Sequence, residues 1–327
     1  QENGEANPVN ADEVCEDSLL DLEKLTEQEP FSHFNLSLIG DSHMGLLSSA
    51  MKERGIPHCG GGIMNGSAFT DGNFAICNEE YFVPLENSES RKRWELVFNN
   101  LRRHEENNTV KSSIVMTNIG VQAHKNAGIF SNWFVKQPKN ESLSMTDKII
   151  NFINNERINN FKILSKLHDA GHNVIVVSDP PFSQYYEYSK LTYPIINSYN
   201  IALEVVCNQI GITFFNVASL FNNEVSDPLN YVSDITFADG TPDWFHGNNK
   251  YYNWLSSKIE LLIENRNLSI KLISTASAFR AGSQNVGHAR LTELLELLYS
   301  DSAKLSEETL LTLKPLLNET LTRLKNK

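Results

Sequence analysis

The sequence predicts an α/β protein with three layers, in which helices cover both faces of a doubly wound, mostly parallel five-stranded sheet. Two observations favour this fold class. Short apolar runs alternate with longer segments of helical period between about residues 34 and 266. Several of these runs end at Gly or Pro, residues that close strands. Strands that alternate with helices in this way pair in parallel, with helices on both faces.

Each element follows from its local pattern. The runs interpreted as strands are HFNLSLIG (33–40), the start of IPHCGGGIMNGSAF (56–69), SSIVMTNIG (112–120), HNVIVVSDPP (172–181) and ITFFNVASLF (212–221). The segments interpreted as helices occupy residues 43–55, 90–107, 145–171, 186–211 and 246–265. Gly55 and Gly171 are expected stops for two of these helices, and Pro194 is expected to disturb another.

The two ends of the chain differ from the alternating region. Residues 1–30 are expected to form a lead with a short helix at 17–28, and residues 31–268 the main domain. Residues 269–327 are Leu-rich with helical period and a break near Ser300, which predicts a C-terminal extension shaped as a helical hairpin. The hairpin is expected to pack on its own main domain, and self-association with a second copy is the alternative.

Composition excludes several classes of partner. The chain of 327 residues carries a formal charge of −12, and this acidic balance disfavours nucleic acid. No apolar run approaches the ~20 residues of a membrane span. The polar, acidic first residues do not resemble a signal peptide, although one could have been removed, so the compartment stays open. The four cysteines lie far apart without a Cys-x-x-Cys pair, so free thiols and disulfides both remain open.

Ser42 is the first candidate for chemistry. It follows the strand-like run at Gly40-Asp41, where a helix is expected to begin. Unpaired backbone N–H groups at a helix start favour negative charge, so a serine there could act as a nucleophile whose oxyanion is stabilised. Helix capping is the structural alternative, since Ser is a common N-cap residue.

A nucleophilic serine needs a histidine base supported by a carboxylate. An Asp lies three residues before a His in two places, at Asp169–His172 and at Asp243–His246. The first pair joins a helix end to a strand start, at the amino edge of the sheet, and we interpret His172 as a surface turn residue. The second pair follows a strand and leads into a helix, at the same carboxyl edge as Ser42. We therefore expect Asp243 and His246 to complete the site.

Two loops at this edge could supply oxyanion donors. CGGGIMNGSAF (59–69) contains glycines that let backbone N–H groups approach a substrate, and TNIGVQAH (117–124) carries the amides of Asn118 and Gln122. A tight turn explains the glycines equally well, and capping of backbone groups explains Asn118. No His-Glu-x-x-His run or carboxylate cluster indicates a metal site, and no cofactor is expected.

The order of GDSH, a Gly-rich loop, an Asn-bearing strand end and DWFH resembles the SGNH hydrolase superfamily, also called GDSL-type esterases, over residues 34 to 266. The resemblance implies a flavodoxin-like fold with Ser42 as nucleophile, His246 as base and Asp243 as its support. It also implies an oxyanion hole formed by the Ser42 N–H, a loop glycine and an Asn side chain. The glycine is expected to be Gly66, with Gly62 as the alternative.

The third block departs from the family's Gly-x-Asn-Asp. Gln122 occupies the Asn slot by length, and Asn118 could serve only if the strand ends earlier. Asp41, His43 and Trp244 are expected to contact substrate. GDSH together with VIVVSDPP is similar to the SGNH domains linked to bacterial polysaccharide O-acylation.

The expected function is therefore a serine esterase that removes O-acetyl or other short acyl groups from a carbohydrate through a seryl-acyl intermediate. A carbohydrate O-acyltransferase and a non-catalytic carbohydrate-binding module of the same fold are the alternatives, and a metal hydrolase is a distant third. Trp244 and Phe245 could stack on a sugar face, whereas Phe182 is expected to lie in the core.

Overall fold

The computed structural model describes the central part of the chain. The described residues are 34–64, 66, 69, 75–77, 82–84, 88–137, 142–185 and 193–264. The short helix expected at 17–28 and the helical extension expected at 269–327 lie outside them, and so does the question of what the extension packs against.

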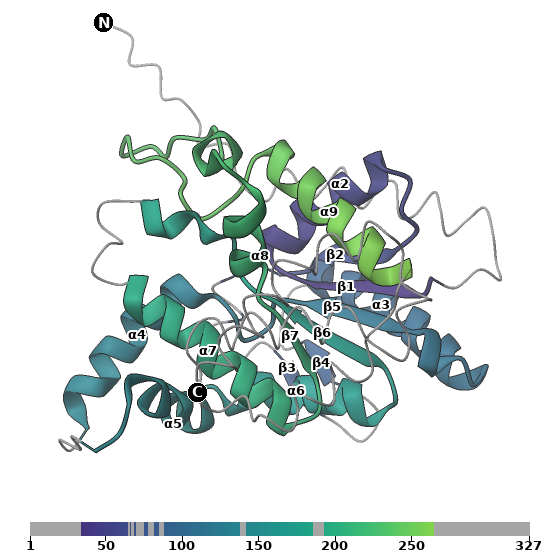
Figure 1. The fold of residues 1–327 in the computed structure, drawn as a ribbon. Helices are drawn as coiled ribbons and strands as arrows, with labels where there is room; N and C mark the ends of the chain where they lie inside the picture. Colours follow the sequence, from purple (N-terminus) through teal and green to yellow (C-terminus); the bar gives the residue numbers. More distant parts are fainter. Residues whose placement is uncertain are drawn as a thin grey trace, which may run out of the picture.

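A five-stranded sheet forms the middle layer (Figure 1). Its strands are β1 (Leu36–Gly40), β2 (Cys59–Gly62), β5 (Ile114–Thr117), β6 (Asn173–Val177) and β7 (Thr213–Phe215). They run in the order β2-β1-β5-β6-β7, and every pair is parallel. This is the flavodoxin-like order of a doubly wound sheet. The predicted fold class is confirmed, and the sheet is parallel throughout.

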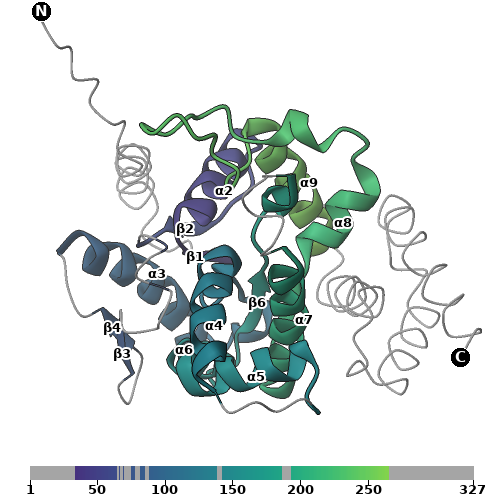
Figure 2. The same ribbon diagram turned by 90° about the vertical axis from the view of Figure 1, so that its left-hand side faces the viewer.

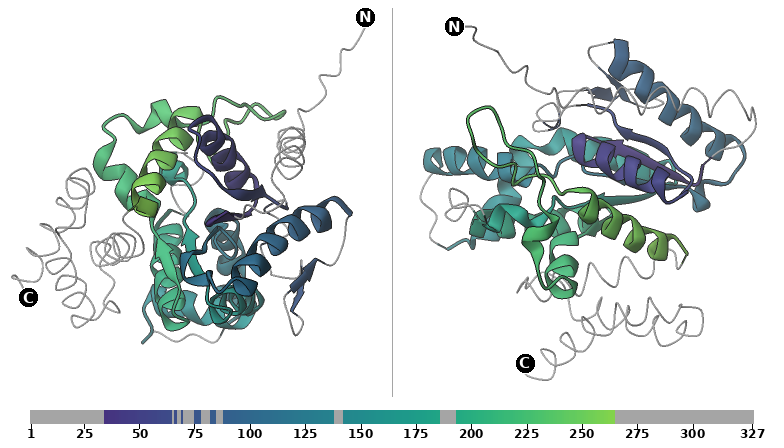
Figure 3. Two further views of the ribbon diagram at one scale, coloured as in Figure 1. Left: turned by 90° about the vertical axis from the view of Figure 1, so that its right-hand side faces the viewer. Right: turned by 90° about the horizontal axis from the view of Figure 1, so that it is seen from above.

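Helices cover both faces of the sheet (Figures 1 and 3). One layer contains α2 (Ser42–Glu53), α8 (Val217–Glu224) and α9 (Asn249–Glu264), and α2 contacts α9 directly. The other layer contains α3 (Ser88–Glu106), α4 (Ala123–Lys136), α5 (Met145–Glu156), α6 (Ile158–Asp169) and α7 (Tyr193–Gln209). An antiparallel pair, β3 (Ala75–Cys77) and β4 (Phe82–Pro84), lies outside these layers beside α3 (Figure 2).

The strands are apolar on both faces because both faces are covered. Leu38 and Met116 pack toward the layer of α2, whereas their chain neighbours Ile39 and Val115 pack toward the layer of α3. All four side chains are completely buried. Burial of a side chain of this size stabilises a fold by about 1.5–3 kcal/mol, so the sheet is held from both sides.

The long helix predicted for residues 145–171 is wrong, because the chain forms two helices there. α5 ends at Glu156 and α6 begins at Ile158, with Arg157 between them at φ −125° and ψ 10°. The Arg157 guanidinium is turned inward, donates to Asn126 Oδ1 at 2.7 Å and lies over the ring of Phe152. These buried contacts outweigh the helical propensity of the segment.

Other boundaries also differ from the predictions. α7 begins at Tyr193, so Pro194 lies in its first turn, where a missing N–H costs no helical hydrogen bond, and does not disturb the helix. The prediction missed α4, the β3–β4 pair and α8, which begins directly after the short strand β7. The Gly-rich run is itself mostly strand, since Gly60 to Gly62 pair with β1.

The topology places a binding crevice. The chain passes from β1 outward to β2 and then crosses back to β5 on the other side of β1. At such a switch point the connections leave in opposite directions and open a crevice at the carboxyl ends of the strands. Ser42 follows β1 and Asn118 follows β5, so both residues lie at this point.

Two of the four cysteines are described as free and buried, Cys59 and Cys207. Burial raises the pKa of Cys59 to about 12 and raises that of Cys207 as well, so both thiols stay protonated at neutral pH. Among the helices of the described residues, none has both the length and the apolar character needed to cross a bilayer.

Candidate active site

Ser42 lies at the tight junction between β1 and α2. Asp41 is the N-cap of α2, and its side chain accepts the N–H of His43 at 3.0 Å. A side chain at Gly40 would collide with Asn118 and Met44, so only glycine lets the strand end this close to β5. Capping is thus performed by Asp41, which leaves the Ser42 hydroxyl for another partner.

That partner is His246. Ser42 Oγ lies 2.8 Å from His246 Nε2, across 204 positions of the chain. On the other side of the ring, His246 Nδ1 lies 2.9 Å from Asp243 Oδ2 and 3.1 Å from Oδ1. Since Asp243 accepts the proton on Nδ1, Nε2 is free to accept the serine proton. The three predicted side chains therefore meet in a Ser-His-Asp chain at the carboxyl edge of the sheet.

The charges around His246 favour its protonated form. Burial lowers its pKa, but the hydrogen bond and charge of Asp243, with the charges of Asp41 and Asp179, outweigh burial and raise the pKa above the ordinary value. Burial raises the pKa of Asp243, because it disfavours the charged carboxylate. The contacts of Asp243 with His246 and with two backbone N–H groups outweigh burial and lower this pKa overall. The pair is thus arranged to take up a proton on the imidazole while Asp243 stays ionised.

His43 packs against the base. Its ring centroid lies 4.5 Å from that of His246, and its Nδ1 lies 3.1 Å from the hydroxyl of Tyr252. Burial and the nearby His246 lower the pKa of His43, so it stays neutral beside the imidazolium that forms on His246. Because the side chain is buried, its visible role is to hold the His246 ring in place.

Both oxygens of the buried Asp41 carboxylate accept hydrogen bonds from the protein. Asn118 Nδ2 donates to Oδ1 at 2.7 Å, and Gln122 Nε2 donates to Oδ2 at 3.1 Å. The backbone of Gly66 also lies against Asp41, since a Cβ at Gly66 would come within 2.8 Å of Oδ2. Asp41 therefore ties the β1 turn to the β5 loop and the Gly-rich loop, and does not present its carboxylate to a ligand.

The two candidate amides play different parts. Both N–H groups of Gln122 are used, one by Asp41 and one by the carbonyl of Asn118 at 3.0 Å. Asn118 donates one of its two side-chain N–H groups to Asp41, and the second N–H group remains. Strand β5 ends at Thr117, earlier than predicted, so Asn118 is the first residue beyond it. Asn118 therefore keeps one N–H group beside the β1 turn that carries Ser42, whereas Gln122 braces the loop.

Gln122 adopts an unusual backbone conformation for a non-glycine residue, at φ 25° and ψ 52°. Such conformations cost free energy and persist where surrounding contacts fix them. Here the contacts to Asp41 and Asn118 compensate, so the strain is local to the loop that presents Asn118.

Replacing Asp41 by Ala should weaken both the fold and the site. The substitution removes a helix cap and the acceptor of two buried amide donors, so the free energy of unfolding should fall by about 2–4 kcal/mol. Urea titration measures this. The exposed Asp169→Ala serves as control and should change it by less than about 0.5 kcal/mol. Equal stability of Asp41→Ala and Asp169→Ala would contradict the bracing role.

The interpretation of His172 as a surface turn residue is wrong, although its place at the amino edge, before β6, is confirmed. His172 is 1% exposed, with Nδ1 2.8 Å from Ser113 Oγ and Nε2 3.0 Å from Glu105 Oε1. Burial lowers its pKa. The residue is a buried tie between β6 and α3.

His172→Ala should therefore destabilise the protein without touching the site. Loss of its buried hydrogen bonds should lower the free energy of unfolding by about 1–3 kcal/mol. Turnover of 4-nitrophenyl acetate by the folded protein should remain that of the wild type. A loss of turnover comparable with that of His246→Ala would contradict this assignment.

A second His and carboxylate lie beside the site, and the sequence analysis did not single them out. Asp179, after β6, accepts the N–H of Ala123 at 2.7 Å, and His124 Nδ1 lies 3.6 Å from the same oxygen. His124 stacks on Phe245, the residue before His246, at 4.4 Å between ring centroids. A polar residue near the end of the predicted strand HNVIVVSDPP (172–181) was the available signal for Asp179. Within the described residues no group of three or more His, Cys, Asp or Glu could hold a metal ion.

The core position expected for Phe182 is confirmed. Phe182 is completely buried and packs edge-on against Phe221 and Tyr251, so it belongs to the core. Trp244 and Phe245 line a pocket next to the triad.

Comparison of the chain with models of protein families, with curated proteins and with solved structures found no match.

Proposed function

We propose that this protein is a serine esterase of the SGNH type, which removes short O-acyl groups, chiefly O-acetyl, from a carbohydrate through a seryl-acyl intermediate. The observation that carries the proposal is the unbroken chain from Ser42 Oγ through the His246 ring to the Asp243 carboxylate. The flavodoxin-like strand order and the Asn118 amide at the neighbouring strand end support the same class.

In the first half of the reaction, His246 Nε2 takes the proton of Ser42 as Oγ attacks the carbonyl carbon of the ester. The carbonyl π bond opens and places a negative charge on its oxygen. The N–H groups of Ser42, Gly66 and Asn118 donate to that oxygen. The tetrahedral intermediate collapses, the bond to the alcohol breaks, and the imidazolium returns its proton to the leaving alkoxide.

In the second half, water takes the place of the alcohol. His246 removes one proton from the water as its oxygen attacks the acyl carbon, and the same donors hold the second oxyanion. Collapse breaks the bond to Ser42 Oγ, which recovers the proton, and releases the carboxylic acid. Asp243 stays ionised and holds the ring in one tautomer throughout.

The two alternative functions differ from the esterase in the fate of the acyl group. A transferase passes the acyl group to a sugar hydroxyl, whereas a binding module forms no acyl-enzyme. Gln122 in place of the family's Asn would favour the binding module if it left no amide donor at this strand end. Gln122 braces Asp41, however, and Asn118 keeps an N–H group, so the substitution does not weaken the enzyme proposal. The polar pocket beside the triad favours a carbohydrate over an aliphatic ester.

Product analysis separates these functions. The protein is incubated with 4-nitrophenyl acetate and glucose, and nitrophenol, acetate and acetylglucose are measured together. We expect acetate to equal nitrophenol, with both lost in Ser42→Ala. Acetylglucose in excess of acetate would instead indicate a transferase. Nitrophenol at the rate of the buffer alone would reject both enzyme functions.

A further inference from the structure

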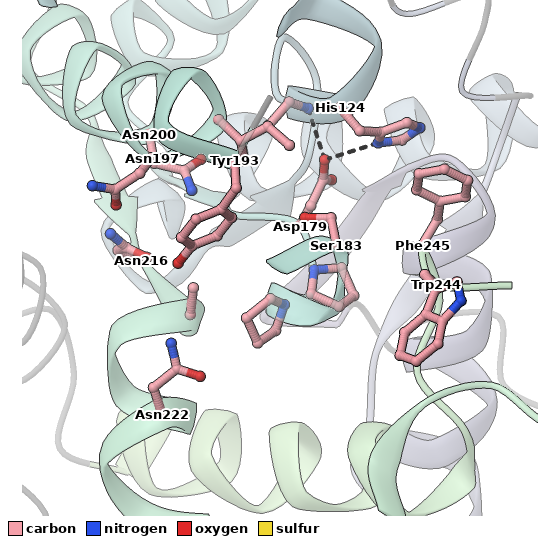
Figure 4. A pocket seen from close by; sticks show the side chains of 15 residues that line it. His124, Asp179, Ser183, Tyr193, Asn197, Asn200, Asn216, Asn222, Trp244 and Phe245 are labelled. Atoms are coloured by element: carbon pink, nitrogen blue, oxygen red, sulfur yellow. Dashed lines mark hydrogen bonds and ion pairs between the residues drawn. The ribbon is translucent and has the colours of Figure 1, made fainter. Parts of the chain in front are cut away.

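A pocket adjoins the triad at the carboxyl ends of β6 and β7, with a volume of about 100 Å³. Trp244 and Phe245, which directly precede His246, form one side of it, and His124 stacks on Phe245. Asn200 and Asn216 lie on the opposite side, and Asp179 lies between the two sides (Figure 4). We call this the amide pocket.

The walls of the amide pocket carry buried acceptors that lack donors. Asn200 Oδ1, Asn216 Oδ1 and Asp179 Oδ1 have no hydrogen-bond partner within the described residues. The two Asn residues are 8% and 4% exposed, and the Asp179 side chain is 11% exposed. Buried polar atoms are almost always paired in native proteins. Three unpaired acceptors around one cavity indicate a ligand that supplies donors.

The side chain of Asn216 does not cap the helix that follows it. Asn216 is the N-cap residue of α8, yet its side chain makes no capping hydrogen bond. The Ser178 hydroxyl accepts the N–H of Val217 instead, at 2.9 Å. Because Ser178 accepts the first N–H group of α8, the Asn216 amide is not needed as a cap and lies at the wall of the pocket.

The chemistry of the walls defines the class of ligand. Three acceptors with the negative charge of Asp179 repel anions and give no gain to an aliphatic chain. They come from three separate elements, the ends of β6 and β7 and the middle of α7, so they line the pocket from more than one direction. A polyol carries several O–H donors on one small frame, and the aromatic side suits the apolar face of a sugar ring.

We infer that the amide pocket binds the hydroxylated part of the substrate, one sugar unit or similar polyol, whose hydroxyls donate to Asn200, Asn216 and Asp179. This inference rests on the proposed function, since it assigns the alcohol side of the ester. Binding there brings the acylated hydroxyl beside Trp244 and Phe245, within reach of Ser42. Specificity among esters then follows from hydroxyl donors rather than from ring size.

The first test compares esters that differ in their hydroxyls. The ratio of kcat/KM for mono-O-acetylglucose to kcat/KM for cyclohexyl acetate is measured, because the two alcohols share ring size but only one has free hydroxyls. We expect the ratio to fall about 3–10-fold in Asn216→Ala and in Asn200→Ala. Asn216→Asp keeps an acceptor oxygen and should therefore retain most of the wild-type ratio. Asn208→Ala, at the far end of the same helix as Asn200, is the control and should not change it.

Unchanged ratios in both Ala variants would overturn the inference while the esterase proposal stands. Melting curves show whether each variant is folded, and we expect no loss of stability because the removed oxygens have no partner to lose.

A second test does not depend on turnover. Saturation-transfer NMR on Ser42→Ala is recorded with glycerol, glucose, galactose and N-acetylglucosamine. We expect a signal from at least one of them that weakens in the double variants Ser42→Ala/Asn216→Ala and Ser42→Ala/Asn200→Ala. No signal from the whole panel, or a signal that neither second substitution weakens, would overturn the inference. Binding that follows the Asn residues in a protein without esterase activity would reject the proposed function and keep the subsite.

Discussion

Ser42→Ala should abolish turnover of 4-nitrophenyl acetate, with kcat falling by at least about 10⁴-fold. The serine hydroxyl is the only group at the site that is hydrogen-bonded to His246 Nε2 among the described residues, at 2.8 Å. Without Oγ no seryl ester forms, and the remaining groups can at most orient a water molecule. Initial rates of nitrophenol release, corrected for the buffer, measure the effect.

Ser49→Ala is the matched control for this prediction. Ser49 lies on the same helix, and its hydroxyl donates to the carbonyl of Gly45 rather than to a side chain of the site. We expect wild-type turnover from Ser49→Ala. Turnover by Ser42→Ala within tenfold of the wild type would show that another group performs the chemistry.

Asp243→Asn should have the second largest effect, a fall in kcat of about 10⁴-fold. The amide can donate a hydrogen bond to Nδ1, which forces the proton onto Nε2 and removes the acceptor that the serine needs. It also removes the charge that stabilises the imidazolium. The ring contact with His43 should keep His246 in place, so the loss comes from the tautomer and the charge.

The pH profile separates these causes. Only neutral His246 can accept the serine proton, so kcat/KM should rise with pH through the His246 pKa and then level. Because Asp243 raises that pKa, the wild-type midpoint should lie above the ordinary value of 6.5. In Asp243→Asn burial still lowers the pKa while the main opposing charge is gone, so the midpoint should move to lower pH. Identical midpoints would contradict the electrostatic role of Asp243.

The sequence was sufficient to predict the five-stranded sheet and to place Ser42, Asp243 and His246 at its carboxyl edge. Short continuous apolar runs are typical of strands that are buried on both faces, and the carboxyl end of a parallel strand is a defined place in the fold. This is why Ser42 and His246 could be assigned to one edge although 204 positions separate them. The same logic separated His246 from His172, which lies at the opposite edge.

Tertiary contacts explain what the sequence did not predict. The helix break at Arg157 depends on a guanidinium that turns inward to Asn126 and Phe152, a contact that no local pattern announces. The burial of His172 depends on Glu105 and Ser113, which lie far from it in the chain.

The details of the site depended on contacts of the same kind. Asp41 and His43 were expected to touch substrate. The structure shows Asp41 bound by Asn118 and Gln122, and His43 packed against His246. Asn118 and Gln122 differ in how many side-chain N–H groups are already hydrogen-bonded. This difference depends on the three-dimensional structure and cannot be predicted from the sequence. Asn200 contributes to the amide pocket from the middle of a helix, where nothing in the pattern distinguishes it.

The most direct test of the central claim is a trapped covalent adduct located by peptide mapping. The wild-type protein, Ser42→Ala and His246→Ala are treated with a serine-directed fluorophosphonate, digested and analysed by mass spectrometry. The account predicts one adduct, on Ser42, absent from Ser42→Ala and formed at least about 10²-fold more slowly in His246→Ala. An adduct on another residue, or labelling of Ser42 at the same rate without His246, would contradict it.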